Sequence, residues 1–208
     1  MRIGFLFNHD QIHQVVHSLP IALALAKSDI YAEILIATTS AKTATEVVRL
    51  LGPDRPARIL LVGLALSSRT SRLVAGMLGR LLLAAKLLVY RDNLDFFRSL
   101  DALIVTERTS LYLKTRYGLE RPLMVLSDHG AGGRAIGFGK STALFDHILA
   151  AGPKICDRLI HDAGVDPKSL TITGYPISLG TTALCLCHFC DTRFGQHSWS
   201  DLYERRIP

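Results

Sequence analysis

Residues 2–37, RIGFLFNHDQIHQVVHSLPIALALAKSDIYAEILIA, contain two short apolar runs separated by a longer stretch. The runs, Arg2 to Phe7 and Ala32 to Ala37, are rich in Ile, Leu and Phe and predict buried strands. Between them, Gln11 to Lys27 has a helical pattern that Pro20 would kink or restart. A strand, a covering helix and another strand in this order predict a parallel sheet with crossover helices.

The same alternation continues along the rest of the chain. Further strands are predicted at 58–62, 102–105, 123–126, 147–150 and 170–173. One intervening helix has Ser40 or Thr43 as its cap, and Thr43 has Glu46 three residues later, as a capping box requires. Six or seven strands separated by helices predict an α/β fold, a Rossmann-like doubly wound parallel sheet with ligands at the carboxyl ends of its strands.

The composition is that of a globular protein with a basic surface. Of the 208 residues, 49% are hydrophobic and 20% are charged, and the formal net charge is +6. The amino-terminal region lacks the basic and apolar pattern of a secretory signal, so we expect a cytoplasmic protein. The positive charge favours anionic partners, but the sequence has no nucleic-acid motif and no aromatic residues interleaved with the basic ones, so nucleic acid is not expected among them.

The longest apolar region, Leu73 to Tyr90, is interrupted by Arg80 and Lys86 and is not expected to span a bilayer. On a helical wheel the basic residues of 69–91 fall within about 140° of one another. They are Arg69, Arg72, Arg80, Lys86 and Arg91. The favoured interpretation is a core-facing helix with a solvated basic stripe. The alternative is peripheral contact with an anionic membrane through 69–91, on the inner face of the cell membrane.

The chain changes character after Pro176. Residues 177–208 hold three of the four cysteines and the single tryptophan, with no clear periodicity after Leu186. We therefore predict a Rossmann-like domain over 1–176 and an irregular tail, or the truncated start of a second domain, over 177–208. A shifted reading frame near codon 177 is the alternative explanation of the tail.

The sequence has two groups of possible metal ligands, and neither predicts a metal site. Cys187 and Cys190 have the Cys-x-x-Cys spacing of a zinc site, with Cys185 nearby, but only His197 follows them where a second ligand pair is usual. The histidines at 9, 13 and 17 recur every four residues without a His-Glu-x-x-His pattern. We expect the cysteines to be reduced, the latter two histidines to be ordinary helix residues, and His9 to line the cleft.

The most informative segment, residues 127–141 (SDHGAGGRAIGFGKS), follows the fifth predicted strand. Five glycines in ten positions let the backbone approach a ligand and present N–H groups to an anion. The segment is not a P-loop, because five residues rather than four separate Gly133 from Gly139. It also lies too late in the domain for a dinucleotide fingerprint. The residues expected to bind substrate here are Gly130, Gly132, Gly133, Arg134 and Lys140.

His129 is the strongest candidate for chemistry. It follows a predicted strand and stands next to Asp128. A histidine accepts a proton from a hydroxyl nucleophile near neutral pH, and a carboxylate beside it orients the ring or raises its basicity. The competing interpretation is a histidine that only hydrogen-bonds the loop backbone.

Several motifs within 123–176 resemble the CDP-glycerol glycerophosphotransferase family, and the resemblance is vaguer over 1–122. The motifs are Asp128-His129-Gly130, Asp146 to Pro153 (DHILAAGP), Asp157-Arg158-Leu159 and Ile172 to Pro176 (ITGYP). The resemblance implies a GT-B architecture, in which two Rossmann-like domains face each other across a cleft. This chain would be the acceptor-side, amino-terminal domain.

The resemblance also implies a reaction and partners. His129 would deprotonate an acceptor hydroxyl for attack on the β-phosphate of a nucleotide-activated donor, while Arg134 neutralises the transferred phosphate. The implied donor is CDP-glycerol or a UDP-sugar, and the implied acceptor carries a hydroxyl and is lipid-linked or a wall polymer. No cofactor is expected. The implied role is transfer of a glycerophosphate or sugar group in cell-wall or surface polymer synthesis.

The sequence departs from this family after its Gly-Tyr-Pro motif. Ile177-Ser178 stand where family members have a basic residue and an aspartate, and no donor-binding half follows. We therefore expect the chain to be incomplete as an enzyme on its own. Two alternatives remain open: a UDP-N-acetylglucosamine 2-epimerase-like enzyme, and a non-catalytic α/β binding module.

Overall fold

The computed structural model describes residues 1–8, 12–28, 31–53, 55–68, 73, 82–127 and 138–174. All of them belong to one compact unit, Met1–Ile177. Residues 178–208 lie outside the described part of the chain.

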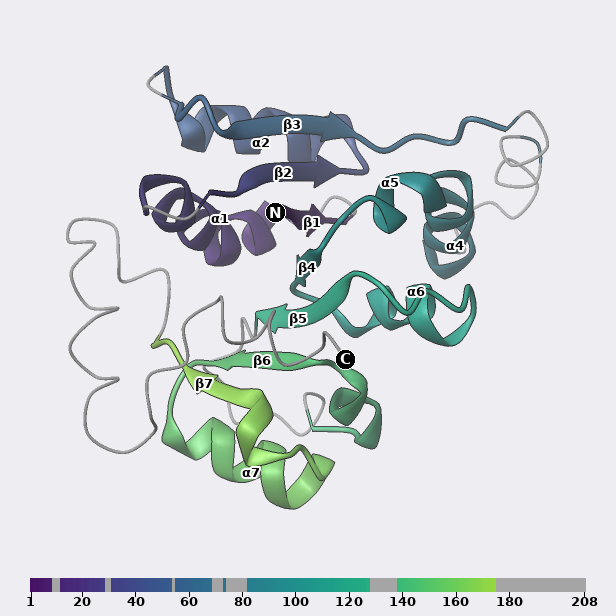
Figure 1. The fold of residues 1–208 in the computed structure, drawn as a ribbon. Helices are drawn as coiled ribbons and strands as arrows, with labels where there is room; N and C mark the ends of the chain where they lie inside the picture. The colour runs from purple at the N-terminus through teal and green to yellow at the C-terminus, as the bar shows by residue number, and fades with distance from the viewer. Residues whose placement is uncertain are drawn as a thin grey trace. The chain divides into compact units, whose positions relative to one another are not determined.

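Seven parallel strands form one sheet in the order β3-β2-β1-β4-β5-β6-β7, seen from top to bottom in Figure 1. Their bounds are β1 Arg2–Phe7, β2 Glu33–Thr38, β3 Ile59–Gly63, β4 Ala102–Val105, β5 Leu123–Ser127, β6 His147–Ala150 and β7 Leu170–Ile172. The order reverses at β1, which pairs with β2 on one side and with β4 on the other. This confirms the predicted doubly wound parallel sheet.

Helices connect the strands, and their bounds follow in chain order. They are α1 Ile12–Lys27, α2 Ala41–Leu51, α4 Leu82–Asp92, α5 Leu94–Arg98, α6 Tyr112–Thr115 and α7 Pro153–Ala163, with short 3₁₀ turns η1 Arg108–Leu111, η3 Lys140–Leu144 and η4 Pro167–Ser169. Since parallel crossovers are right-handed, the connections that lead from β1 to β3 and those that lead from β3 to β7 cover opposite faces of the sheet. α1 is one continuous helix through Pro20.

Both faces of the central strands of the sheet are buried. Leu6 of β1 and Leu35 of β2 pack in one cluster with Phe97 of α5 and Leu159 of α7. The alternate residues along the same strands point to the opposite face. They are Ile3, Phe5, Ile34 and Ile36, each 0% exposed. Burial on two faces explains why these strands are continuous apolar runs rather than alternating ones.

Ser40 is the N-cap of α2, and the capping box predicted at Thr43 is wrong. The Oγ of Ser40 accepts a hydrogen bond from the Thr43 backbone N–H at 3.2 Å. Glu46 pairs with Arg49 instead, through bonds of 2.8 and 2.7 Å. The Glu46 carboxylate therefore forms an ion pair on the exposed face of α2 instead of capping the helix, because a basic partner lies one turn further along.

The basic stripe predicted over 69–91 is wrong at Lys86. This residue lies on α4 and is 7% exposed, and its Nζ lies 2.5 Å from Oε2 of Glu107. Arg91 is exposed and lies beside Asp92. Arg69, Arg72 and Arg80 lie outside the described residues. A helical wheel compares only the residues of one helix, so it could not reveal the partner of Lys86. That partner, Glu107, follows strand β4. Among the helices described, none is long and apolar enough to cross a membrane.

Candidate functional site

The carboxyl ends of β1, β4 and β5 meet at one edge of the sheet. The register pairs Leu6 with Val105, and Val105 with Leu126. Phe7, Thr106 and Ser127 therefore follow at the same level, and adjacent strands lie about 4.8 Å apart. In an open α/β sheet, the crevice beside the strand where the order reverses is where ligands bind.

Most of the predicted site residues lie outside the described part of the chain. They are His9, Asp128, His129, Gly130, Gly132, Gly133 and Arg134. The positions from which they continue are described: Asn8 precedes His9, and Ser127 precedes Asp128. Those two positions flank Thr106 and are about 10 Å apart across two strand spacings.

The downstream end of the glycine-rich segment is also described. Phe138 is 8% exposed, and the guanidinium carbon of Arg158 on α7 lies 3.8 Å from the centre of its ring. Lys140, another predicted substrate-binding residue, begins η3 and is exposed. The fold thus fixes both ends of the segment: Ser127 in the sheet, and Phe138 against α7.

A hydrogen-bonded group holds the carboxyl ends of β1 and β2 against α4. Asn8 is 2% exposed, and its Nδ2 donates to the Tyr90 hydroxyl at 2.6 Å. Thr39 donates its hydroxyl to Oδ1 of Asn8 at 3.0 Å. Burial raises the pKa of Tyr90, and the Glu107 carboxylate raises this pKa further. Tyr90 therefore stays protonated at neutral pH and keeps Asn8, the residue before His9, in place.

A second polar group follows β4: Thr106, Glu107 and Arg108. Lys86 of α4 binds one carboxylate oxygen of Glu107, and the side chains of this pair are only 8% and 16% exposed. The other oxygen of Glu107, the Thr106 hydroxyl and the Nε of Arg108 are buried, and none of them has a hydrogen-bond partner among the described residues. Sequence reasoning missed this group, although three polar residues directly after a predicted strand were a usable signal.

Two motif residues that carry the family resemblance have structural roles. Asp146 accepts hydrogen bonds from the Met124 backbone N–H, at 2.8 Å, and from Lys114. His147 is 3% exposed, and its Nε2 lies 2.8 Å from the Thr171 hydroxyl. These bonds join β5, β6 and β7. At least two residues of the motif DHILAAGP therefore stabilise the fold instead of taking part in a reaction.

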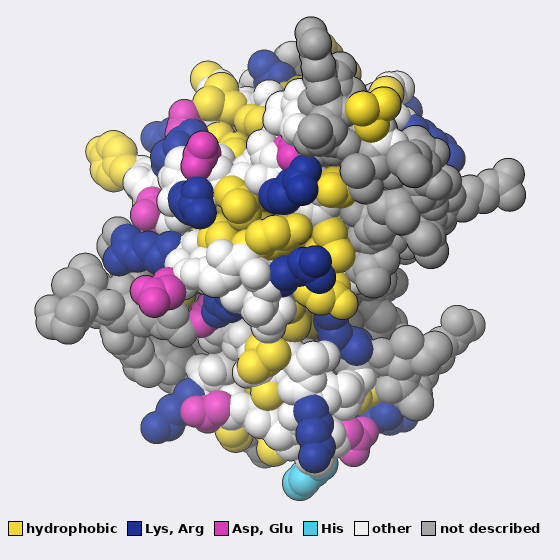
Figure 2. Space-filling model, turned by 90° about the vertical axis from the view of Figure 1, so that its right-hand side faces the viewer, with side chains coloured by type: hydrophobic (Ala, Val, Ile, Leu, Met, Phe, Trp, Pro, Cys, Tyr) yellow, Lys and Arg dark blue, Asp and Glu magenta, His cyan; other side chains and the backbone are white. Residues whose placement is uncertain are grey.

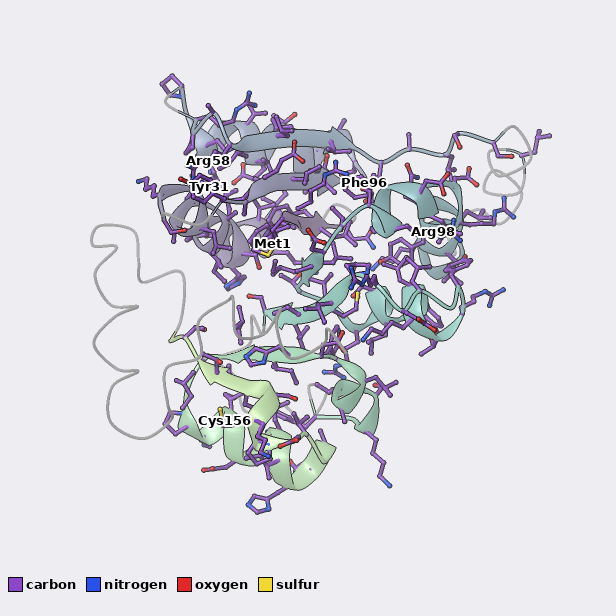
Figure 3. The ribbon with its side chains drawn as sticks, viewed as in Figure 1. Met1, Tyr31, Arg58, Phe96, Arg98 and Cys156 are labelled. Atoms are coloured by element: carbon purple, nitrogen blue, oxygen red, sulfur yellow. The ribbon has the colours of Figure 1, made fainter. Side chains whose placement is uncertain are left out.

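Two surface hollows lie at the other end of the sheet. One, of about 390 Å³, is lined by residues at the starts of β1, β2 and β3, and Figure 3 shows Met1, Tyr31 and Arg58 there. Another, of about 350 Å³, lies around 117–121 and Arg98. Amino ends of parallel strands are not where such folds bind ligands, so we assign no role to either hollow.

The polar group after β4 has donors and acceptors that suit an organic anion. Figure 2 views the molecule from the right-hand side of Figure 1 and shows Lys and Arg side chains spread among hydrophobic ones. Within the described ranges, no three His, Cys, Asp or Glu side chains gather as metal ligands. The group after β4 offers a carboxylate oxygen, a hydroxyl and a guanidinium, which can bind a ligand that carries both hydroxyls and negative charge.

No family model and no curated protein matches this sequence. By structure, the chain is similar to the UDP-GlcNAc 2-epimerase from Methanocaldococcus jannaschii, with a TM-score of 0.52 and 12% identity over 85% of this chain and 46% of that one. A lipopolysaccharide outer core galactosyltransferase, WaaB in its apo form, gives a TM-score of 0.47 and 12% identity over 84% and 45%.

The chain spans less than half the length of each of these two proteins. The likeness to the epimerase shows the fold, a Rossmann-like α/β domain, and confirms that expectation.

Proposed function

We propose that this chain is the acceptor-side domain of a GT-B-type transferase, which moves a glycerophosphate or sugar group from a nucleotide-activated donor to a hydroxyl acceptor. The observation that supports this most is the meeting of three strand ends at one edge. There Asn8 leads into His9, Ser127 leads into Asp128-His129, and the polar residues after β4 lie between them. Residues 1–176 would form this domain, and 177–208 the tail or the start of the donor-binding part.

In this proposal His129 is the base, and Asp128 orients or activates its imidazole. The acceptor oxygen forms its new bond at the β-phosphate of CDP-glycerol, expelling CMP, or at the anomeric carbon of a UDP-sugar, expelling UDP. The acceptor proton passes to His129 in either case. Arg134 and Lys140 balance negative charge on the transferred group, and the glycines at 130, 132 and 133 leave space for it.

The proposed setting is the cytoplasmic face of a membrane where a lipid-linked or wall-polymer acceptor is extended. Peripheral contact through 69–91 would then rely on the arginines at 69, 72, 80 and 91, because Lys86 is buried against Glu107. Such contact gives binding that weakens as salt increases.

A donor assay on the complete protein tests this function and its donor. CDP-glycerol and UDP-N-acetylglucosamine are supplied separately with a membrane fraction as the source of acceptor. Release of CMP from the first or UDP from the second, dependent on the acceptor fraction, supports the transferase. If both donors bind without release of CMP or UDP, and neither is otherwise converted, the chain belongs instead to a non-catalytic α/β binding module.

A UDP-N-acetylglucosamine 2-epimerase-like activity is the second candidate. The observation that favours it is the similarity in fold to the archaeal UDP-GlcNAc 2-epimerase, at a TM-score of 0.52. An epimerase needs no acceptor. Proton NMR of UDP-N-acetylglucosamine incubated with the complete protein alone would show the 2-epimer if this candidate is right, and unchanged substrate if it is wrong.

A further inference from the structure

We infer that Thr106, Glu107 and Arg108 form a subsite for an anionic ligand that also carries hydroxyl groups, such as a phosphorylated or carboxylated sugar. The inference rests on the proposed function only in taking this ligand to be the acceptor, because binding itself requires no turnover. The three residues follow β4 directly, at the carboxyl edge and beside the end of β1.

Arg108 differs from two other partly buried arginines of the domain, Arg2 and Arg158. Arg2 pairs with Glu33 at 2.8 Å. Arg158 is also partly buried, and it has both a carboxylate partner, Asp162, and an aromatic partner, Phe138. Arg108 has neither among the described residues, although its Nε is inaccessible to solvent. Removing part of a guanidinium from water without a counter-charge costs free energy, which a bound anion would offset.

The Arg108 guanidinium lies beside Gly139, in the turn before η3. A Cβ placed on Gly139 would lie 3.9 Å from Nη1 of Arg108 and 4.0 Å from Oγ of Ser141. Gly139, Lys140 and Ser141 are all exposed. The guanidinium therefore lies beside an exposed backbone turn that has no side chain at Gly139, and the Ser141 hydroxyl and the adjacent Lys140 can add donors to the same anion.

The local charge favours an anion. Lys86 balances the negative charge of Glu107 through the 2.5 Å pair. The charge of Arg108 is not balanced by any described carboxylate within ion-pairing distance, so Lys86, Glu107 and Arg108 together carry a net charge of about +1. In a partly dry environment this single charge attracts an anion more strongly than it would in water.

Thr106 and Glu107 are the reason why we expect the ligand to carry hydroxyl groups. The Thr106 side chain is 2% exposed and its hydroxyl has no partner, and one Glu107 oxygen is likewise buried and unpaired. A buried polar atom left unpaired costs roughly 1–3 kcal/mol. A ligand hydroxyl can donate to the Glu107 oxygen and accept from Thr106, which satisfies both groups while the anionic end of the ligand meets Arg108.

Isothermal titration of the purified protein tests the inference with four probes: inorganic phosphate, glucose 6-phosphate, glucuronate and glucose. We expect the sugar phosphate or the sugar acid to bind at least tenfold more tightly than phosphate or glucose alone, and the preferred one identifies the anionic group. Arg108→Gln should weaken this binding tenfold or more. The affinity of Arg108→Lys should lie between those of wild type and Arg108→Gln. Arg98→Gln, on an exposed arginine of α5 that pairs with Asp95, is the matched control and should change nothing.

A second variant separates ligand binding from folding. Thr106→Val keeps the shape of the side chain and removes the hydroxyl. It should therefore weaken binding of the hydroxyl-bearing anion and leave the affinity for inorganic phosphate unchanged. Urea unfolding of each variant verifies that the fold persists. The inference is overturned if none of the four probes binds the wild-type protein, or if a folded Arg108→Gln protein binds them as wild type does. Failure of the proposed transfer would instead appear as intact binding without release of CMP or UDP.

Discussion

The Nζ of Lys86 lies 2.5 Å from Oε2 of Glu107, and the two side chains are only 8% and 16% exposed. Lys86 comes from α4 and Glu107 from the turn after β4, which are separated by 21 residues in the sequence. The pair therefore fixes α4 against the carboxyl edge of the sheet, where the candidate site lies.

Lys86→Met should destabilise the domain, because it leaves the Glu107 carboxylate buried without its counter-charge. Removing one partner of a buried pair costs roughly 3 kcal/mol, while replacing both by apolar residues is often neutral. The double variant Lys86→Met with Glu107→Leu should therefore recover most of the loss. Urea unfolding measures both free energies, and a Lys86→Met protein as stable as wild type would show that the pair contributes nothing.

Tyr90 should make the domain sensitive to alkaline pH. Burial holds the pKa of its hydroxyl above the ordinary value of 10.0. The unfolded chain therefore loses this proton at lower pH than the folded protein does. Tyr90 should therefore leave the free energy of unfolding unaffected below about pH 10. Above that pH, this group should lower the free energy of unfolding by up to about 1.4 kcal/mol per pH unit.

Comparison with Tyr90→Phe isolates this contribution. The variant loses the bond to Asn8, at a cost of about 1 kcal/mol, but its stability should fall less steeply than that of wild type above pH 10. Tyr31→Phe is the control, because Tyr31 is 91% exposed. Urea unfolding at pH 8 to 11 gives the slopes, and equal slopes for wild type and Tyr90→Phe would contradict the assignment.

Gly4→Ala should destabilise the domain, since β1 has no space for a side chain at this position. A Cβ on Gly4 would lie 2.6 Å from one methyl of Leu100 and 3.0 Å from one of Leu103, and both leucines are at most 1% exposed. Overpacking of this kind costs about 1–3 kcal/mol.

Gly63→Ala is the matched control, in the edge strand β3. A Cβ on Gly63 would meet nothing within 4 Å. We expect its free energy of unfolding to remain within about 0.5 kcal/mol of wild type. Thermal unfolding of the two variants should therefore separate them, and equal melting temperatures would mean that Leu100 and Leu103 reposition at no cost.

The sheet could be predicted from the sequence because its signals are local. Each strand is a short run of Ile, Leu and Val, and β1, β4 and β6 begin and end at the predicted residues. Parallel strands buried on two faces produce such runs, and the helices between them fix the crossovers. The strand order, with its reversal at β1, and the register were not predicted and come from the structure.

The predictions that failed depended on partners distant in sequence or on a choice between local partners. Lys86 belongs to a basic face on a helical wheel, yet Glu107 draws it into the interior. Glu46 had two possible roles, and the pairing with Arg49 prevailed over the capping box. Thr106, Glu107 and Arg108 were missed because their significance depends on which of their atoms lack partners, and only coordinates reveal this. The roles of His129 and Asp128 stay predictions.

Donor turnover by the His129→Ala variant of the complete protein tests the central claim most directly. A general base contributes about 10²–10⁴-fold, so we expect acceptor-dependent release of CMP or UDP to fall by at least 100-fold while the free energy of unfolding and the affinity for sugar anions stay as in wild type. Release at the wild-type rate from a folded His129→Ala protein would contradict the claim that this histidine accepts the acceptor's proton.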